Sequence, residues 1–280
     1  MLRSLTTFKV PVPVTGVRSS PSSNPPLNIL TMNIPWRQLT GLDLQLEPSN
    51  LPTLDEALDI LSQTVNLKYG TLQLECTWGR RDTQRDKILL PTLDSTFQLI
   101  LQDANTPADR LEACLIQFLN LLCLSKLRVL RLGWLANSNV GSWSLAHTDF
   151  IAFLGASAKT LRELTMTYLP IPENELLECL SQVPQITHLD LRFALHEGAN
   201  DPITNRLLLA CTIPSSTVSG GIACSTPPAH AEISLLPRLE HINLQCHRAL
   251  YASAVLLNFI QSMWRSDKGS ISYNCSSCNL

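Results

Sequence analysis

Residues 125–134 read Ser-Lys-Leu-Arg-Val-Leu-Arg-Leu-Gly-Trp, with leucines at positions 127, 130 and 132. The same spacing of apolar residues at the first, fourth and sixth positions returns at 39–44, 161–166, 186–191 and 239–244. Two further copies are looser: Gly70 takes the fourth position of the copy that begins at Leu67, and 93–99 is spaced one residue differently. Short segments of this kind, apolar at alternate positions, predict β-strands with one buried face.

The segments between these strands carry the apolar period of amphipathic helices. We expect helices over 54–61, 108–122, 148–157, 172–180, 201–209 and 253–264. The strands begin 25 to 34 residues apart, except for a last interval of 53 residues that contains a segment rich in Ser, Thr, Gly and Pro. The repeat predicts an α/β fold of the leucine-rich-repeat type, a solenoid or horseshoe with parallel strands on its concave face and helices on its convex face.

Composition divides the chain into three parts. Residues 1–33 are rich in Pro and Ser, and we expect them to be irregular with remnant repeat strands. We expect residues 34–265 to form the repeat domain, with 211–231 as a loop excursion, and 266–280 to be an irregular tail. A repeat fold rarely begins without a cap, so we also expect the chain to be a truncated form.

Charge and cysteine content limit the function classes. The formal net charge is −2 and only 16% of residues are charged, which argues against binding to nucleic acid because that needs a concentrated basic face. No apolar run reaches the roughly 18 residues that a membrane span needs. The nine cysteines are odd in number and scattered, which favours reduced thiols in a cytoplasmic or nuclear protein.

Sequence motifs for chemistry are sparse. No glycine-rich phosphate loop, nucleophile elbow or metalloprotease helix occurs, so we predict no catalytic residues, no cofactor and no metal. The alternative is an enzyme or zinc-binding protein that uses the one C-x-x-C pair, Cys275 and Cys278, together with His241, Cys246 and His247. That alternative requires these five side chains to converge.

The residues most available to contact a partner are those at strand positions that point away from the core. By period-two alternation these are the third, fifth and seventh residues of each copy. They are Gly41, Asp43 and Gln45; Val129, Arg131 and Gly133; Glu163, Thr165 and Thr167; His188, Asp190 and Arg192; His241, Asn243 and Gln245. As contact residues for a protein partner we single out Asp43, Gln45, Arg131, Glu163, His188, Asp190, Arg192, His241 and Asn243. Their mixed charge suits a protein surface better than nucleic acid or a small molecule.

Several segments resemble one known family. Ile34-Pro-Trp-Arg-Gln-Leu-Thr-Gly-Leu-Asp-Leu44 and the following 57–67 look like the repeat region of F-box-like leucine-rich-repeat proteins of mushroom-forming fungi. The pairs 161–166 with 171–177, and 235–242 with 259–265, resemble the same family, so the similarity covers about 34–265. In that family an N-terminal F-box docks on the Skp-type adaptor of a cullin ubiquitin ligase, and the repeats hold the substrate.

The resemblance implies a non-catalytic interaction module, the substrate-receptor part of such a ligase. No F-box helices precede the repeats here, which makes a Skp-type adaptor a doubtful partner. The alternative is an intact adaptor whose F-box is 51–78, beginning Leu51-Pro52. That requires 64–78 to be helical, whereas Gly70 and the alternation of Leu72, Leu74 and Cys76 favour a strand.

Overall fold

The protein has an α/β fold built on one parallel sheet. The computed structural model describes residues 7–10, 32–78, 85–102, 108–135, 143–193, 201–212, 234–246, 251–264 and 270–275. The order across the main sheet is β1-β2-β3-β5-β7-β8-β9-β10-β11, and each adjacent pair is parallel. Each strand of this sheet therefore lies beside the strand of the same sheet that precedes it in the chain.

The strands of the main sheet are β1 (Thr7–Val10), β2 (Gly41–Leu44), β3 (Tyr69–Glu75), β5 (Thr96–Gln102), β7 (Val129–Leu135), β8 (Glu163–Thr167), β9 (His188–Arg192), β10 (His241–Cys246) and β11 (Ser270–Cys275). A separate parallel pair joins β4 (Ile88–Leu89) to β6 (Leu122–Cys123). The helices are α1 (Leu54–Gln63), α2 (Ala108–Asn120), α3 (Ser144–Ser157), α4 (Glu173–Ser181), α5 (Asn205–Cys211) and α6 (Ser253–Trp264), and two 3₁₀ turns, η2 (Trp36–Gln38) and η3 (Pro48–Asn50), flank β2.

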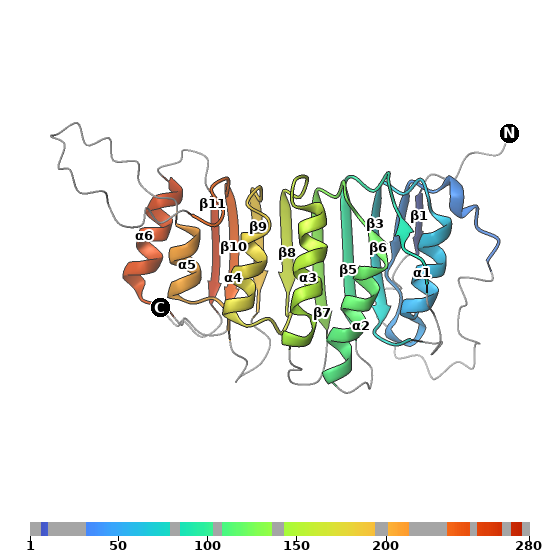
Figure 1. Ribbon diagram of the computed structural model, residues 1–280, viewed down its shortest axis with the longest axis horizontal. Helices are drawn as coiled ribbons and strands as arrows, with labels where there is room; N and C mark the ends of the chain where they lie inside the picture. The colour runs from blue at the N-terminus through green and yellow to red at the C-terminus, as the bar shows by residue number, and fades with distance from the viewer. Residues whose placement is uncertain are drawn as a thin grey trace, which may run out of the picture.

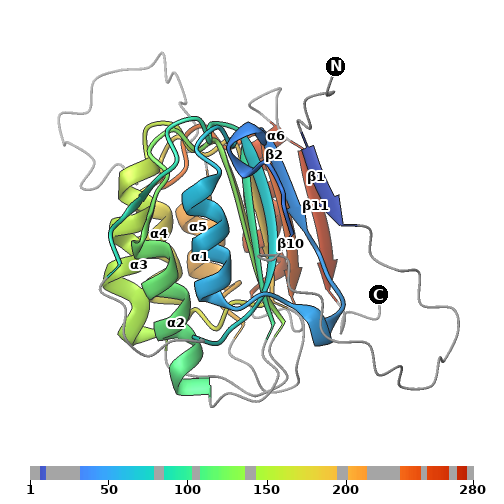
Figure 2. The same cartoon turned by 90° about the vertical axis from the view of Figure 1, so that its right-hand side faces the viewer.

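The helices form one layer and the sheet the other. They follow one another in a row along the sheet (Figure 1), and from the side α1 to α5 stand on one face of it (Figure 2). The predicted α/β class and the predicted strands are thus confirmed. No described helix is long and apolar enough to cross a membrane.

The strands begin two residues later than the apolar spacing predicts, and β5 three residues later. The first apolar residue of each copy closes a turn instead: the N–H of Leu39 donates to the carbonyl of Trp36, and the N–H of Leu127 to that of Leu124, both at 3.1 Å. Both leucines are fully buried, so this position belongs to the core without belonging to the strand. The next two apolar positions, such as Leu130 and Leu132, point from the strand into the space between sheet and helices.

The copy that contains Gly70 is completed by its neighbour. Gly70 lies in register with Phe97 of β5, and Phe97 is fully buried. A Cβ on Gly70 would sit 3.6 Å from the Phe97 ring and 3.4 Å from the side chain of Leu67. The large ring thus fills the space that the missing leucine leaves, which preserves the close packing of the core.

Some predicted helix ends are wrong. Helix α3 begins at Ser144, four residues before the predicted start, and α2 ends at Asn120 because Leu122–Cys123 pair with β4. Helix α5 begins at Asn205 and not near Asp201: the Thr204 hydroxyl accepts hydrogen bonds from the N–H groups of Arg206 and Leu207 as N-cap. The Asp201 carboxylate instead accepts from the N–H of Ile203 in the turn before it.

The terminal segments contribute two strands. Thr7–Val10, within the segment expected to hold remnant strands, pairs with β2. The expectation of an irregular tail over 266–280 is wrong for Ser270–Cys275, which extends the sheet as β11. Its alternation of polar and apolar residues places Ile271 against the core. The predicted excursion at 211–231 lies almost wholly outside the described residues.

Candidate functional site

The sheet face opposite the helices carries the candidate contact residues, and we call it the outer face. Arg131 shows the alternation: its side chain is exposed, while Leu130 and Leu132 on either side are 1% and 2% exposed. The prediction that the third, fifth and seventh residues point away from the core is confirmed for the described strands, whose outward positions are half-buried or exposed. An exception is Gly41, which is buried under a neighbouring side chain.

Strand register arranges these side chains in rows that cross the sheet. One row runs through Val129, Glu163, His188, His241 and Ser270; the next through Asp43, Thr71, Gln98, Arg131, Thr165, Asp190, Asn243 and Ser272; the third through Gln73, Ile100, Gly133, Thr167, Arg192 and Gln245. Seven of the nine candidates lie together on β7 to β10. Asp43 and Gln45 lie apart, beyond β3 and β5.

A polar cluster centres on Asp190. Its carboxylate accepts hydrogen bonds from Nε of Arg192 at 2.9 and 3.1 Å and from Nη2 at 2.5 Å, and Nδ2 of Asn243 on β10 donates to Oδ1 at 2.9 Å. The hydrogen bond to Asp190 raises the pKa of the Arg192 guanidinium above its usual value. Three of the predicted residues are therefore fixed relative to one another before any partner binds.

Two histidines form the neighbouring part of the outer face. The rings of His188 and His241 stack with centroids 4.2 Å apart and an interplanar angle of 26°. Nδ1 of His188 shares a hydrogen bond with the Thr187 hydroxyl at 2.9 Å, and Nδ1 of His241 shares one with the Ser270 hydroxyl. Both rings are thus oriented by hydroxyl groups beside them.

Arg131 and Glu163 are held less tightly than Asp190 and Arg192. Nη2 of Arg131 lies 3.9 Å from Oε2 of Glu163, longer than a hydrogen bond, and the Arg131 side chain is 48% exposed. Arg131 stands between two hollows of the outer face, one of about 440 Å³ toward β5 and one of about 300 Å³ toward β10. Thr165 and Asp190 also line both hollows.

Asp43 and Gln45 belong to a second polar group at the β1 end of the sheet. Nζ of Lys9 lies 3.2 Å from Oδ2 of Asp43, and Nε2 of Gln45 donates to Oδ1 at 2.8 Å. Beside them, the Tyr69 hydroxyl shares a 3.0 Å hydrogen bond with that of Thr7, so the ring spans β2 at Gly41. A Cβ on Gly41 would lie 2.2 Å from this ring. Sequence reasoning missed the Tyr69 contact, although aligning the repeats places Tyr69 beside Gly41.

The residues proposed for a zinc or catalytic site come together only in part: Cys275 of β11 lies in register with Cys246 of β10, whereas His241 is on the other face of the sheet. His241 faces outward on β10, whereas Cys246, five positions later on the same strand, is fully buried on the core face. The Cys246 thiol lies 3.7 Å from the Tyr251 hydroxyl. His247 and Cys278 lie outside the described residues, and within the described residues no three His, Cys, Asp or Glu side chains are arranged to hold a metal ion.

The F-box interpretation of 51–78 requires a helix that is not formed. Helix α1 ends at Gln63, and Tyr69–Glu75 is strand β3, paired with β2 and β5. The expected alternation of buried Leu72, Leu74 and Cys76 is what the structure shows.

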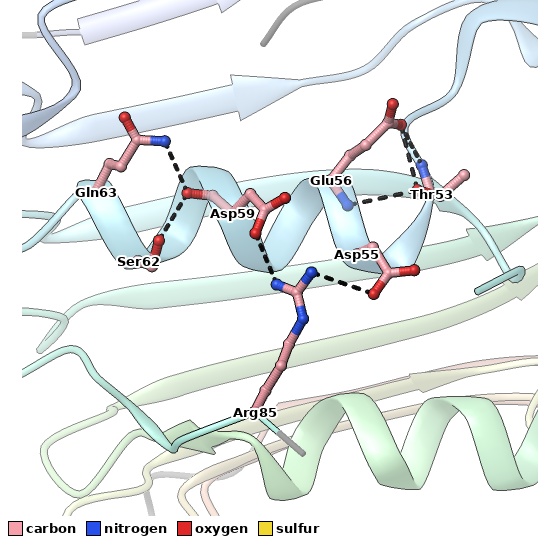
Figure 3. A network of polar contacts seen from close by, with 7 residues as sticks. All are labelled: Thr53, Asp55, Glu56, Asp59, Ser62, Gln63 and Arg85. Carbon is pink, nitrogen blue, oxygen red and sulfur yellow. Dashed lines mark hydrogen bonds and ion pairs between the residues drawn. The ribbon is translucent and has the colours of Figure 1, made fainter. Parts of the chain in front are cut away.

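A third polar network lies on the helix side and ties α1 to the chain before β4 (Figure 3). The Arg85 guanidinium bridges two carboxylates of α1, with Nη2 3.3 Å from Oδ1 of Asp55 and Nη1 2.7 Å from Oδ1 of Asp59. At the start of the helix, Thr53 and Glu56 form a reciprocal capping box. These contacts stabilise the helix and lie away from the outer face.

Comparison of the chain with models of protein families, with curated proteins and with solved structures gives no match. The outer face therefore has to be interpreted from its own geometry.

Proposed function

We propose that the chain is a leucine-rich-repeat solenoid that acts as a non-catalytic protein-binding module, with the outer face of β7 to β10 as its contact surface. The recurrent apolar spacing, the sequential parallel order of the strands and the row of helices on one face all support this architecture. The observation that carries the function is the contiguous polar surface formed by Arg131, Glu163, His188, Asp190, Arg192, His241 and Asn243.

The chemistry of this surface favours a protein partner. Positive and negative groups alternate across it, from Arg131 and Glu163 to Asp190 and Arg192, which suits the mixed charges of another protein and not a phosphate backbone. The hydrogen bonds around Asp190 and the two stacked histidines already order these side chains. A surface ordered in advance loses less conformational entropy on binding.

The family resemblance extends the proposal to the substrate receptor of a ubiquitin ligase. Because residues 51–78 do not form the F-box helices that dock on a Skp-type adaptor, a pull-down with the full chain tests whether this adaptor is bound at all. Absence of the adaptor from the complex removes the ligase role and leaves the binding module.

The experiment that tests the outer face is proximity labelling with the full chain as bait. Arg131→Glu and Asp190→Arg reverse charges on the surface, and each is expected to weaken capture of the main partner at least tenfold, because a like charge then faces the partner. Lys126→Glu, a charge reversal in the exposed turn before β7, is the matched control and should retain capture. Undiminished capture by both outer-face variants, with folding intact, would count against this surface.

A further inference from the structure

The larger hollow of the outer face is created by a glycine. Gly133 lies at its base, between Ile100 on β5 and Thr167 on β8 in the same row. The three atoms nearest to a Cβ at position 133 would all belong to Ile100, at 3.5 Å or more, which is ordinary van der Waals contact. The fold therefore tolerates a side chain here, and its absence leaves the hollow open. We call it the Gly133 hollow.

The polar wall of the Gly133 hollow is rich in hydrogen-bond donors. Arg131 and Arg192 contribute guanidinium groups, and Gln98, Thr165 and Thr167 add an amide and two hydroxyls. The one acid in the lining, Asp190, already accepts from Arg192 and Asn243. Arg131 has only the distant Glu163 among its described ion pairs, so a positive charge remains available at the hollow.

The other wall is apolar. Ile100 is half-buried, and the side chain of Leu135 is exposed although it is a large aliphatic group. A guanidinium beside exposed aliphatic surface matches a group that presents a carboxylate and methyl groups together.

We propose that the Gly133 hollow receives an Asp or Glu side chain of the protein partner, while an aliphatic residue next to it in that partner covers Ile100 and Leu135. This rests on the proposed function, because it assigns the partner's chemistry at the same surface. The carboxylate forms an ion pair with Arg131 and accepts from the hydroxyls of Thr165 and Thr167. A single negative charge fits better than a phosphate, since Asp190 and Glu163 stand nearby and repel a second charge.

The test is selection of random twelve-residue peptides displayed on phage against the full chain. The enriched peptides are expected to contain Asp or Glu beside Leu, Ile or Val. Gly133→Val, which fills the hollow with a residue that favours strands, and Arg131→Gln, which removes the cation, should each weaken binding of a synthetic enriched peptide at least tenfold. Lys126→Gln is the matched control and should leave binding unchanged. Gly133→Ala replaces Gly133→Val if the valine variant fails to fold.

A double-mutant cycle supplies the decisive comparison. Replacing the acidic residue of the peptide by its amide should cost binding to the original chain and cost little further in Arg131→Gln, because both changes remove one ion pair. Equal binding by all variants, enrichment without an acidic residue, tighter binding of a phosphoserine version of the peptide, or no enrichment overturns the proposal. The proposed function is judged separately by the charge reversals in proximity labelling, so the two can fail independently.

Discussion

Two glycines on the outer face have opposite effects: the surface is closed over one and hollow over the other. Gly41 and Gly133 both occupy outward strand positions where other copies carry side chains. Tyr69 lies over Gly41 and closes the face there, whereas no side chain lies as close over Gly133 and a hollow remains. The two glycines differ in their neighbours across the sheet, Tyr69 beside Gly41 and Ile100 and Thr167 beside Gly133, and the position of the Tyr69 ring decides the outcome.

Two buried cysteines give the chain a predictable response to alkaline pH. Cys179 in α4 and Cys211 in α5 are 0% and 1% exposed. Burial raises the pKa of each thiol from 9.0 to about 12, and Glu175 and Glu178 add to the effect at Cys179. The folded state therefore keeps both thiols protonated at pH values where the unfolded chain ionises them.

We predict that the free energy of unfolding falls as pH rises from about 9 toward 12. Each thiol pKa is higher in the folded state, so its contribution is fully present below about pH 9 and is lost through this window, at up to ~1.4 kcal/mol per pH unit for each thiol. Urea unfolding at pH 8.5, 9.5 and 10.5 measures the slope. The Cys179→Ala/Cys211→Ala double variant should show a shallower fall, and an identical slope in both proteins would contradict the assignment.

At the scale of elements, α1 depends on a residue from outside the helix. Asp55 is 3% exposed and points at Arg85, whose guanidinium also binds Asp59 (Figure 3). Removal of the Arg85 guanidinium lowers the free energy of unfolding by more than the ion pair itself contributes, because the negative charge of Asp55 then stays buried without this cation.

Arg85→Gln is expected to lower the free energy of unfolding by about 2–3 kcal/mol, measured by urea denaturation. Asp59→Asn is the matched control: Asp59 is 38% exposed, so its pair with Arg85 should contribute under about 1 kcal/mol. If the two variants lose the same stability, Arg85 acts through Asp59 alone and not through the buried Asp55.

Most of these elements could be predicted from the sequence, because strand and helix periods are local properties of the chain. The period-two alternation also predicted correctly which side chains face outward, Arg131 and Asp190 among them. The short strands β4 and β6 could not be predicted, since two-residue segments carry no period. Nor could the contacts of the candidate site: the stacking of His188 on His241 depends on rotamers set by Thr187 and Ser270, which local patterns do not encode.

At the scale of the whole molecule, each strand–helix unit is stabilised mainly by the units next to it in the chain. Each described strand of the main sheet pairs only with the strands of that sheet next to it in the chain, so among the described residues no strand pairing joins the two ends. Strands β5 and β7 are paired on both sides, whereas β1 and β11 have one partner each among the described residues. Opening should therefore begin at the ends.

Hydrogen exchange should follow this order, with amides of β5 and β7 exchanging slowest and those of β1 and β11 fastest, as measured by mass spectrometry of peptic fragments. Ile271→Ala, which removes the packing of β11 on the core, should accelerate exchange in β11 and in α6 beside it and leave β5 unchanged. Leu99→Ala, in the buried centre of β5, is the matched truncation and should accelerate exchange throughout, at a cost of about 3 kcal/mol. If Ile271→Ala accelerates exchange equally in β5 and β11, the prediction is contradicted. The chain then unfolds as one cooperative unit, with its two ends coupled through the core.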